Sequence, residues 1–295
     1  MIRRPYAAGS FYPLYKEALI QMIEECFLNK EFGPGSLPNG FKGDYAFGGI
    51  APHAGYIYSG PCAAWLYKYL KEYAKPETVV ILGTNHTGLG DKVTTLVTYK
   101  WETPLGIVDT DLEFGKLLIK EIAVEDFLAI QYEHSVEVQL PFLQYIYGNT
   151  FKLVPVILKD MDLEEVEDLA KIIYEISEEL NRKIIVIASS DFTHHGEYYG
   201  YVLFKENPNE NVKKLDLKYI KAIEELDTKK FFELIEKYNG TVCGYLAIGT
   251  LIEYTKLIGG KLKLLKYYTS ADITKDEELI VGYASVLGIK RNVPL

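Results

Sequence analysis

The sequence predicts a single α/β domain, residues 1–295, with a central, largely parallel or mixed β-sheet flanked by helices. Apolar, β-branched runs alternate along the chain with segments of helical periodicity, which is typical of βαβ units. The 295 residues can bury a large core without disulfides. Two glycine-, proline- or lysine-containing stretches, 33–43 and 205–213, are expected to be surface loops and do not resemble linkers between independent domains.

Each element follows from its local pattern. Residues 78–82 form a continuous apolar run, which predicts a strand buried on both faces, and Asp162 opens a segment with a capping-box pattern. Asp227 caps a helix that Gly240 ends. The expected strands are 45–51, 78–82, 93–99, 151–158, 183–188, 261–270 and 279–287, and the expected helices are 59–73, 111–121, 162–180, 215–226, 228–238 and 243–257.

Composition and charge exclude several classes of protein. The net charge of −9 argues against non-specific binding to nucleic acid or to anionic membranes. No apolar run approaches the ~18–20 residues of a membrane span, and the basic N-terminus is not followed by an apolar segment. Three widely spaced cysteines fit a reducing compartment. We therefore expect a cytoplasmic protein with an unknown small-molecule or peptide ligand, and with neither nucleic acid nor membrane as a partner.

Histidine and aspartate follow three of the predicted strands. His53 comes after one strand, His86 after a second, and Asp191 with His194 after a third. Ligands of open α/β sheets bind outside the carboxyl ends of the strands, and neutral imidazole is the commonest metal ligand. A loop histidine on its own is often an ordinary surface residue. The shared placement instead favours a mononuclear metal site with open positions.

Other catalytic motifs are absent from the sequence. There is no H-E-x-x-H, no pair of CxxC motifs and no phosphate loop with its lysine. A Ser–His–Asp hydrolase could use Ser189, Ser190 or Ser59, but no G-x-S-x-G segment supports that hypothesis.

Cys243 and His134 each have more than one interpretation. Cys243 opens the apolar helix expected at 243–257, and a helix N-terminus favours the thiolate, so it is a nucleophile, a metal ligand or a small core residue. Cys26 and Cys62 are expected to be packing residues. His134 either begins a helix or lines a pocket, with Glu137 one turn further along.

At these residues the sequence resembles the Memo family. The matching segments appear in order along nearly the whole chain: RPYAAGSFYP at 4–13, APHAGYIYSG at 51–60, LGTNH at 82–86, EHSVEVQLP at 133–141, SSDFTH at 189–194 and VCG at 242–244. The resemblance implies a fold like that of the class III, LigB-type non-haem iron extradiol dioxygenases.

The resemblance also implies a metal site. In those dioxygenases two histidines and a glutamate bind Fe(II), and a further histidine acts as acid and base. In the Memo family a cysteine takes the place of the carboxylate ligand, so His53, His86 and Cys243 become the expected ligands. Asp191 and His194 are expected to be catalytic, with His194 in the acid/base place. Fe(II) is the first expectation for the metal and copper the second, because a thiolate is a softer ligand than a carboxylate.

Two classes of function remain open. The first is a metal-dependent oxidoreductase, related to the dioxygenases, of unassigned substrate. The second is a non-catalytic protein that holds a metal or binds a peptide. His134 and Tyr56 are expected in the substrate pocket. A peptide would need exposed aromatic residues near the site, for which Tyr56, Tyr58 and Tyr245 are the candidates. Family members that occur with a radical-SAM protein imply a functional link to such a partner.

Overall fold

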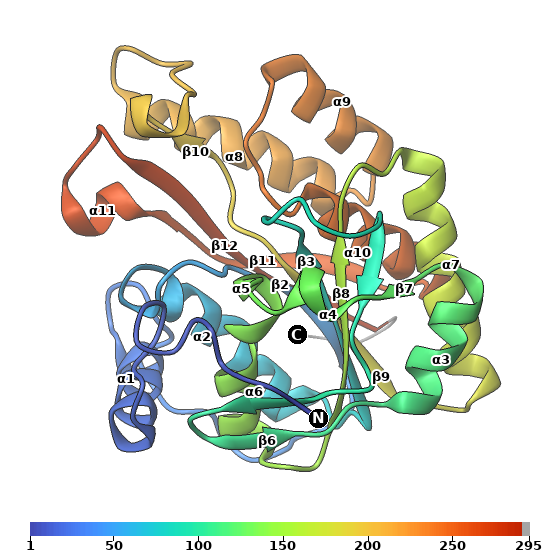
Figure 1. Cartoon of the computed structure of the whole chain (residues 1–295). Coiled ribbons are helices and arrows are strands. Elements are labelled where there is room, and N and C mark those ends of the chain that lie inside the picture. The colour runs from blue at the N-terminus through green and yellow to red at the C-terminus, as the bar shows by residue number, and fades with distance from the viewer. Residues whose placement is uncertain (291–295) are drawn as a thin grey trace.

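A mixed β-sheet of nine strands runs through the centre of the computed structural model, which describes residues 1–290 (Figure 1). The strand order is β10-β12-β2-β9-β3-β8-β4-β7, and β11 pairs with β12. The strands are β2 (Ala46–Ala51), β3 (Thr78–Thr84), β4 (Val93–Thr95), β7 (Val124–Glu125), β8 (Lys152–Leu158), β9 (Ile184–Ser189), β10 (His194–His195), β11 (Lys261–Thr269) and β12 (Ile280–Ile289).

The middle of this sheet is parallel. Strand β9 lies between β2 and β3 and is parallel to both, and β3 is also parallel to β8. Strands β10, β11 and β2 pair antiparallel with β12, and β4 pairs antiparallel with β8. A second sheet holds three short strands in the order β1 (Ile2–Arg3), β5 (Lys100–Thr103) and β6 (Gly106–Val108). The N-terminal strand β1 therefore belongs to this small sheet and not to the central one.

Helices cover both faces of the large sheet (Figure 1). One face packs against α1 (Lys16–Leu28), α2 (Tyr56–Tyr73) and α6 (Leu140–Tyr147), and their buried side chains form one hydrophobic core. The other face packs against a second set of helices and a second core. That set consists of α3 (Leu112–Glu121), α7 (Leu163–Glu179), α8 (Pro208–Glu224), α9 (Thr228–Tyr238) and α10 (Tyr245–Ile258). Burial on both faces explains the continuous apolar runs of the central strands.

Four short helical segments connect the larger elements. They are α4 (Phe127–Ile130), α5 (His134–Glu137), the 3₁₀ turn η1 (Glu197–Tyr199) and α11 (Ser270–Thr274). Helix α5 carries His134 at its first position and follows the N-cap Glu133, whose side chain accepts a hydrogen bond from Ser135 N. Of these segments, α5 brings His134 to the edge of the sheet where the parallel strands end.

The predicted single α/β domain with a mixed sheet flanked by helices is confirmed, and the curled sheet is consistent with a LigB-type fold. The predicted capping box at Asp162 is present, and the Asp227 side chain caps α9. Residues 291–295 of the predicted domain lie outside the described residues. Within residues 1–290, no helix combines the length and the apolar character that crossing a membrane requires.

Several predicted bounds differ from the structure, and two of these differences have a clear physical cause. The strand expected at 93–99 ends at Thr95, because the chain then leaves the large sheet and Lys100 pairs with Ile2 in the small one. The loop expected at 205–213 is partly helical, since α8 begins at Pro208. Proline suits the first position of a helix because its φ is already helical and its missing N–H would have no partner there.

Candidate metal centre

Three adjacent parallel strands bring His53, Asp191 and His86 to one edge of the sheet. His53 follows β2, Asp191 follows β9 and His86 follows β3, and these strands lie in the order β2-β9-β3. His134 reaches the same edge from α5, and Cys243 from the connection between α9 and α10. The site thus draws on segments far apart in the sequence, as expected for carboxyl ends of parallel strands.

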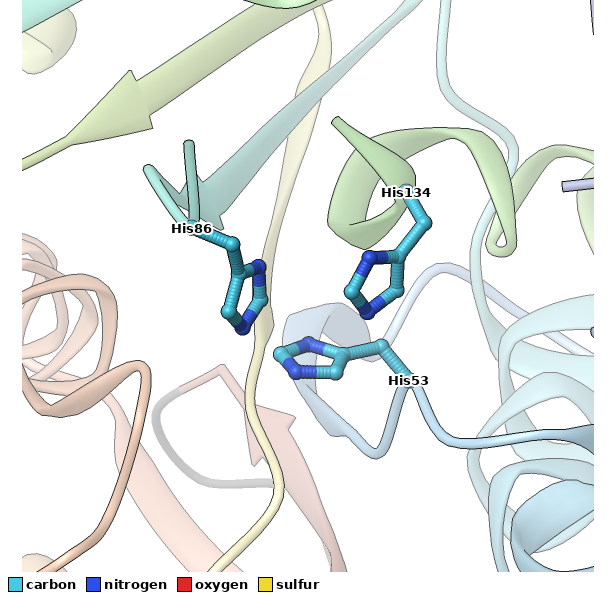
Figure 2. Close-up of side chains that lie close together, drawn as sticks. All are labelled: His53, His86 and His134. Carbon is cyan, nitrogen blue, oxygen red and sulfur yellow. The ribbon is translucent and has the colours of Figure 1, made fainter. Parts of the chain in front are cut away.

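The rings of His53, His86 and His134 face one another (Figure 2). The ring centroids are 5.2 Å apart for His53 and His86, 5.2 Å for His53 and His134, and 4.6 Å for His86 and His134. One nitrogen from each ring lies within 4.8 Å of the others, a spacing that would let the three rings hold one metal ion.

His53 also belongs to a second group of donors. Its Nε2 lies 3.2 Å from Cys243 Sγ, and donor atoms of His53, Asp191 and Cys243 all lie within 4.8 Å of one another. The predicted ligands His53, His86 and Cys243 therefore take members from both groups, with His53 common to the two. The structure adds His134 and Asp191 as further candidate donors at the same place.

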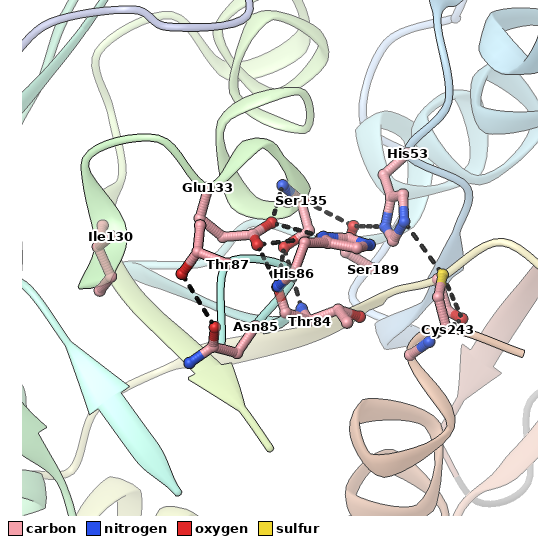
Figure 3. Close-up of polar contacts among 12 residues, drawn as sticks. His53, Thr84, Asn85, His86, Thr87, Ile130, Glu133, Ser135, Ser189 and Cys243 are labelled. Atoms are coloured by element: carbon pink, nitrogen blue, oxygen red, sulfur yellow. Dashed lines mark hydrogen bonds and ion pairs between the residues drawn. The ribbon is translucent and has the colours of Figure 1, made fainter. Parts of the chain in front are cut away.

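The hydrogen bonds of His53 fix which ring nitrogen is free (Figure 3). Its Nδ1 lies 3.0 Å from Ser189 Oγ. Ser189 Oγ donates its one hydrogen to the carbonyl of Ser135 at 2.6 Å and accepts from Gln139 Nε2 at 2.9 Å. Because the serine hydrogen is already used, His53 Nδ1 must donate to Ser189. Nε2 is then the nitrogen that shares a proton with Cys243 and that, without this proton, offers its lone pair to a metal.

Glu133 binds Nδ1 of His86, as Ser189 binds Nδ1 of His53. The His86 Nδ1 lies 3.0 Å and 3.1 Å from the two Glu133 oxygens, and the backbone N–H of His86 also donates to Glu133 at 2.6 Å. Burial would raise the pKa of Glu133, but the hydrogen bond and charge of His86 outweigh it and lower the pKa to about 2. Carboxylates that bind the second nitrogen of a ligand histidine orient its ring in many metal sites.

Burial and close contacts shift the pKa values of His86, His134 and Cys243. Burial would lower the pKa of His86, yet contacts with Cys243 and Glu133 raise it to about 10. Burial, followed by the charges of His53 and His86, lowers the pKa of His134 to about 3. Burial opposes ionisation of Cys243, but the charge and hydrogen bond of His53 outweigh it and lower the pKa to about 6. Cys243 therefore resembles a thiolate ligand, whereas burial raises the pKa of Cys26 to about 12.

His194 and His195, which follow β9 in the sequence, differ in their surroundings. His194 Nδ1 lies 3.0 Å from the carbonyl oxygen of Thr241, to which it must donate, so its lone pair is on Nε2. His195 is buried, and its Nε2 accepts the backbone N–H groups of Leu203 and Phe204. The lone pair of His195 is thus consumed by the backbone, while that of His194 stays free to accept a proton.

Asp191 lies beside His53. Its Oδ1 accepts the backbone N–H of His53 at 2.9 Å, and its Oδ2 lies 3.8 Å from His53 Nε2. Burial raises the pKa of the Asp191 carboxyl against the lowering influence of His194. Asp191 therefore fixes the backbone that carries His53 and lies within reach of the same metal position.

A cavity of about 750 Å³ opens beside these side chains. His53, His86, His134, Asp191 and His194 all line it, together with aromatic residues that include Phe11, whose ring stacks on His134 at 4.3 Å.

Tyr56 lies apart from this cavity. Its side chain is buried and its hydroxyl donates to the carbonyl of Val138, whereas Tyr58, two residues further on, lines the cavity. The sequence did not predict that Glu133 and Ser189 support the candidate metal site. For Glu133, the sequence feature that could have indicated this role is its place next to His134 at the start of a helix.

The donor set fits a first-row transition metal. Imidazole and thiolate ligands suit iron, copper and zinc, and carboxylate extends that range to the harder ions. The Nδ1 atoms of His53 and His86 both donate to protein oxygens, which leaves each Nε2 as a ligand atom.

Comparison with known proteins agrees with the motifs. A family model described as "Memo-like protein" matches residues 3–287. The chain is 44% identical over 291 residues to a MEMO1 family protein of Methanopyrus kandleri, covering 97% of this chain and 99% of the relative. It is 43% identical over 296 residues to a MEMO1 family protein of Pyrococcus abyssi and 42% identical over 291 residues to one of Methanobrevibacter smithii, with the same coverage. The chain belongs to the Memo-like family.

Proposed function

We propose that this chain is a metal-dependent oxidoreductase with a mononuclear site formed by His53, His86 and Cys243, for which Fe(II) is the first candidate and copper the second. The main support is the position of His53, whose Nε2 lies 3.2 Å from Cys243 Sγ while its ring faces that of His86. A site that only stored a metal would not need an open cavity of about 750 Å³ beside it.

The residues around the metal position have distinct parts in the proposal. The bound metal would supply redox chemistry and open coordination positions. Ser189 and Glu133 orient the two imidazoles, and Asp191 holds the backbone of His53. His194, whose Nε2 carries the lone pair, accepts a proton from the substrate and returns it later.

Metal content and oxygen uptake test this function. Protein prepared without oxygen is titrated with Fe(II) and with copper(I), and the loaded protein is then mixed with a panel of phenolic and thiol substrates while O₂ uptake is recorded. One equivalent of metal with substrate-dependent uptake supports the oxidoreductase. One equivalent without uptake for any substrate supports the second candidate, a non-catalytic protein that holds a metal or binds a peptide; Tyr58 and Tyr198 on the cavity wall favour that candidate.

His194→Ala is expected to lower kcat by about 10²–10⁴-fold at unchanged metal stoichiometry, because it removes the proton acceptor. The matched control is His195→Gln, whose amide oxygen can still accept the N–H groups of Leu203 and Phe204. The control should keep both metal and turnover. If His195→Gln abolished turnover and His194→Ala did not, the two roles would have to be exchanged.

Glu133→Gln is expected to weaken metal binding by about 10–100-fold, the usual loss when a carboxylate behind a ligand histidine is removed. The amide keeps a hydrogen-bonding group near His86 but loses the charge that favours donation from Nδ1. Anaerobic titration of Fe(II) measures the effect. Glu164→Gln, on the exposed side of α7, is the control, and equal affinity of both variants would mean that Glu133 does not orient His86.

A further inference from the structure

The lining of the cavity bears on the substrate. Beside the histidines, five of the lining residues are aromatic: Phe11, Tyr58, Tyr198, Tyr199 and Tyr283. We propose that the cavity binds an organic cation, an amine on an aromatic or apolar body, in preference to a carboxylate or phosphate. This inference rests on the proposed function, since it names the substrate class of the same site.

Two of these tyrosines, which are consecutive in the sequence, lie beside His194 in space. The Tyr199 ring lies 5.2 Å from that of His194 at an interplanar angle of 80°, and the Tyr198 ring lies 5.2 Å from that of Tyr199. Tyr198 is 83% exposed and Tyr58 is 38% exposed, so their rings are open to a ligand. The face of a tyrosine ring attracts ammonium groups, and several rings together are a common way to bind them.

Among residues 1–290 the cavity wall carries carboxylates but no lysine or arginine, and the charge of His86, whose pKa is raised, is paired with Glu133. The carboxylates belong to Asp276 and Asp191. Asp276 is exposed, and its Oδ1 accepts the backbone N–H of Glu278 at 2.9 Å. No lysine, arginine or histidine of the described chain forms an ion pair with it. A carboxylate or phosphate on the outer part of a substrate would meet Asp276 without a compensating cation.

A second cavity, next to the first, also has more acidic than basic side chains in its lining. It measures about 770 Å³ and shares Tyr198 and Leu279 with the first, so these two side chains form the partition between them. Its lining includes Glu197, Glu277 and Glu278, and Lys205 is the one lysine or arginine among its described lining residues. The three glutamates form no ion pairs within residues 1–290, and they extend the negative potential around the mouth of the metal cavity.

These observations give the substrate an orientation. Its reacting end lies toward His53 and His194, where the candidate metal ligands and the proton acceptor are. Its cationic end lies between the tyrosine rings and Asp276, where it is stabilised by both. The overall charge of −9 adds long-range attraction for a cation, which salt weakens.

Three ligands that share a phenol ring and differ in charge test the proposal: tyramine, 4-ethylphenol and 3-(4-hydroxyphenyl)propanoate. Calorimetric titration compares their affinities for the metal-free protein and for the anaerobic Fe(II)-loaded protein. We expect tyramine to bind about tenfold more tightly than the propanoate, with 4-ethylphenol between them, as one partly desolvated cation–π contact would produce.

Asp276→Asn should reduce the preference for tyramine to about threefold, because one of two favourable contacts for the cation remains. The asparagine oxygen can still accept from Glu278 N, so the turn is kept. The control is Asp168→Asn on the exposed side of α7, which should leave the preference unchanged.

The outcomes separate this inference from the function on which it rests. A propanoate that binds as tightly as tyramine, or three probes that all fail to bind at millimolar concentration, would overturn the cation preference. An unchanged preference in Asp276→Asn would overturn the role of its carboxylate. Protein that binds no metal yet prefers tyramine would refute the oxidoreductase and support the cation site.

Discussion

Replacing Cys243 by serine is expected to weaken copper(I) binding by more than about 100-fold, since even outer partners of metal ligands are worth about 10–100-fold. Serine is a poor ligand, so Fe(II) binding should weaken as well. Cys243→Glu should retain Fe(II) binding and weaken copper(I) binding, because a carboxylate is a harder donor than a thiolate. Anaerobic titration of the wild type and both variants with each metal measures these changes.

The same variants should differ in their response to peroxide. The pKa of Cys243 is lowered to about 6 chiefly through His53 and against the effect of burial, so near neutral pH the residue is largely thiolate and open to oxidation to sulfenic and then irreversible acids. Glutamate has no such chemistry. Cys62→Ser is the control, because burial raises the pKa of that thiol and keeps it inert. Copper(I) affinity that is equal in the wild type, Cys243→Ser and Cys243→Glu would show that the thiolate is not a ligand.

The sequence could predict part of this site because parallel strands impose a geometry. His53, His86 and Asp191 each follow an apolar run, and carboxyl ends of neighbouring parallel strands meet at one edge. The order β2-β9-β3, which makes them neighbours, has no local signal. The helix start at Cys243 left nucleophile, metal ligand and core residue open, and only the family resemblance selected the ligand. The residue lies between two helices, and its distance from His53 depends on how α10 packs on the sheet.

Residues that act through others were harder to predict. The role of Ser189 depends on its contact with His53, 136 residues away, and that of Glu133 on its contact with His86, 47 residues away.

Tyr56 and Tyr58 were difficult to predict for a different reason. The predicted helix at 59–73 begins three residues earlier, at Tyr56, so both tyrosines are helical. Residues two apart on a helix point to nearly opposite sides, which buries Tyr56 and leaves Tyr58 at the cavity.

Glu137→Ala is expected to lower the free energy of unfolding by about 3–5 kcal/mol, the cost of leaving one member of a buried ion pair without its partner. Glu137 and Arg3 are 0% and 1% exposed and form an ion pair. The same carboxylate accepts the backbone N–H groups of Tyr6 and Ala7 and the hydroxyl of Tyr12, each at 2.7 Å. The charge of Arg3 would be left buried beside Trp101. Urea unfolding followed by circular dichroism measures the change.

The neighbouring pair of Arg4 and Glu102 provides the control, because it joins the next arginine of the chain to a carboxylate at the surface. The Arg4 side chain is 73% exposed, so Glu102→Ala should cost no more than about 1 kcal/mol. The double variant Arg3→Met with Glu137→Leu should recover part of the loss, since it removes both charges rather than one. Equal losses in Glu137→Ala and Glu102→Ala would mean that the buried pair contributes little. Glu137 ends the short helix that His134 begins, so the carboxylate that holds the N-terminal segment also belongs to the helix that carries a cavity-lining histidine.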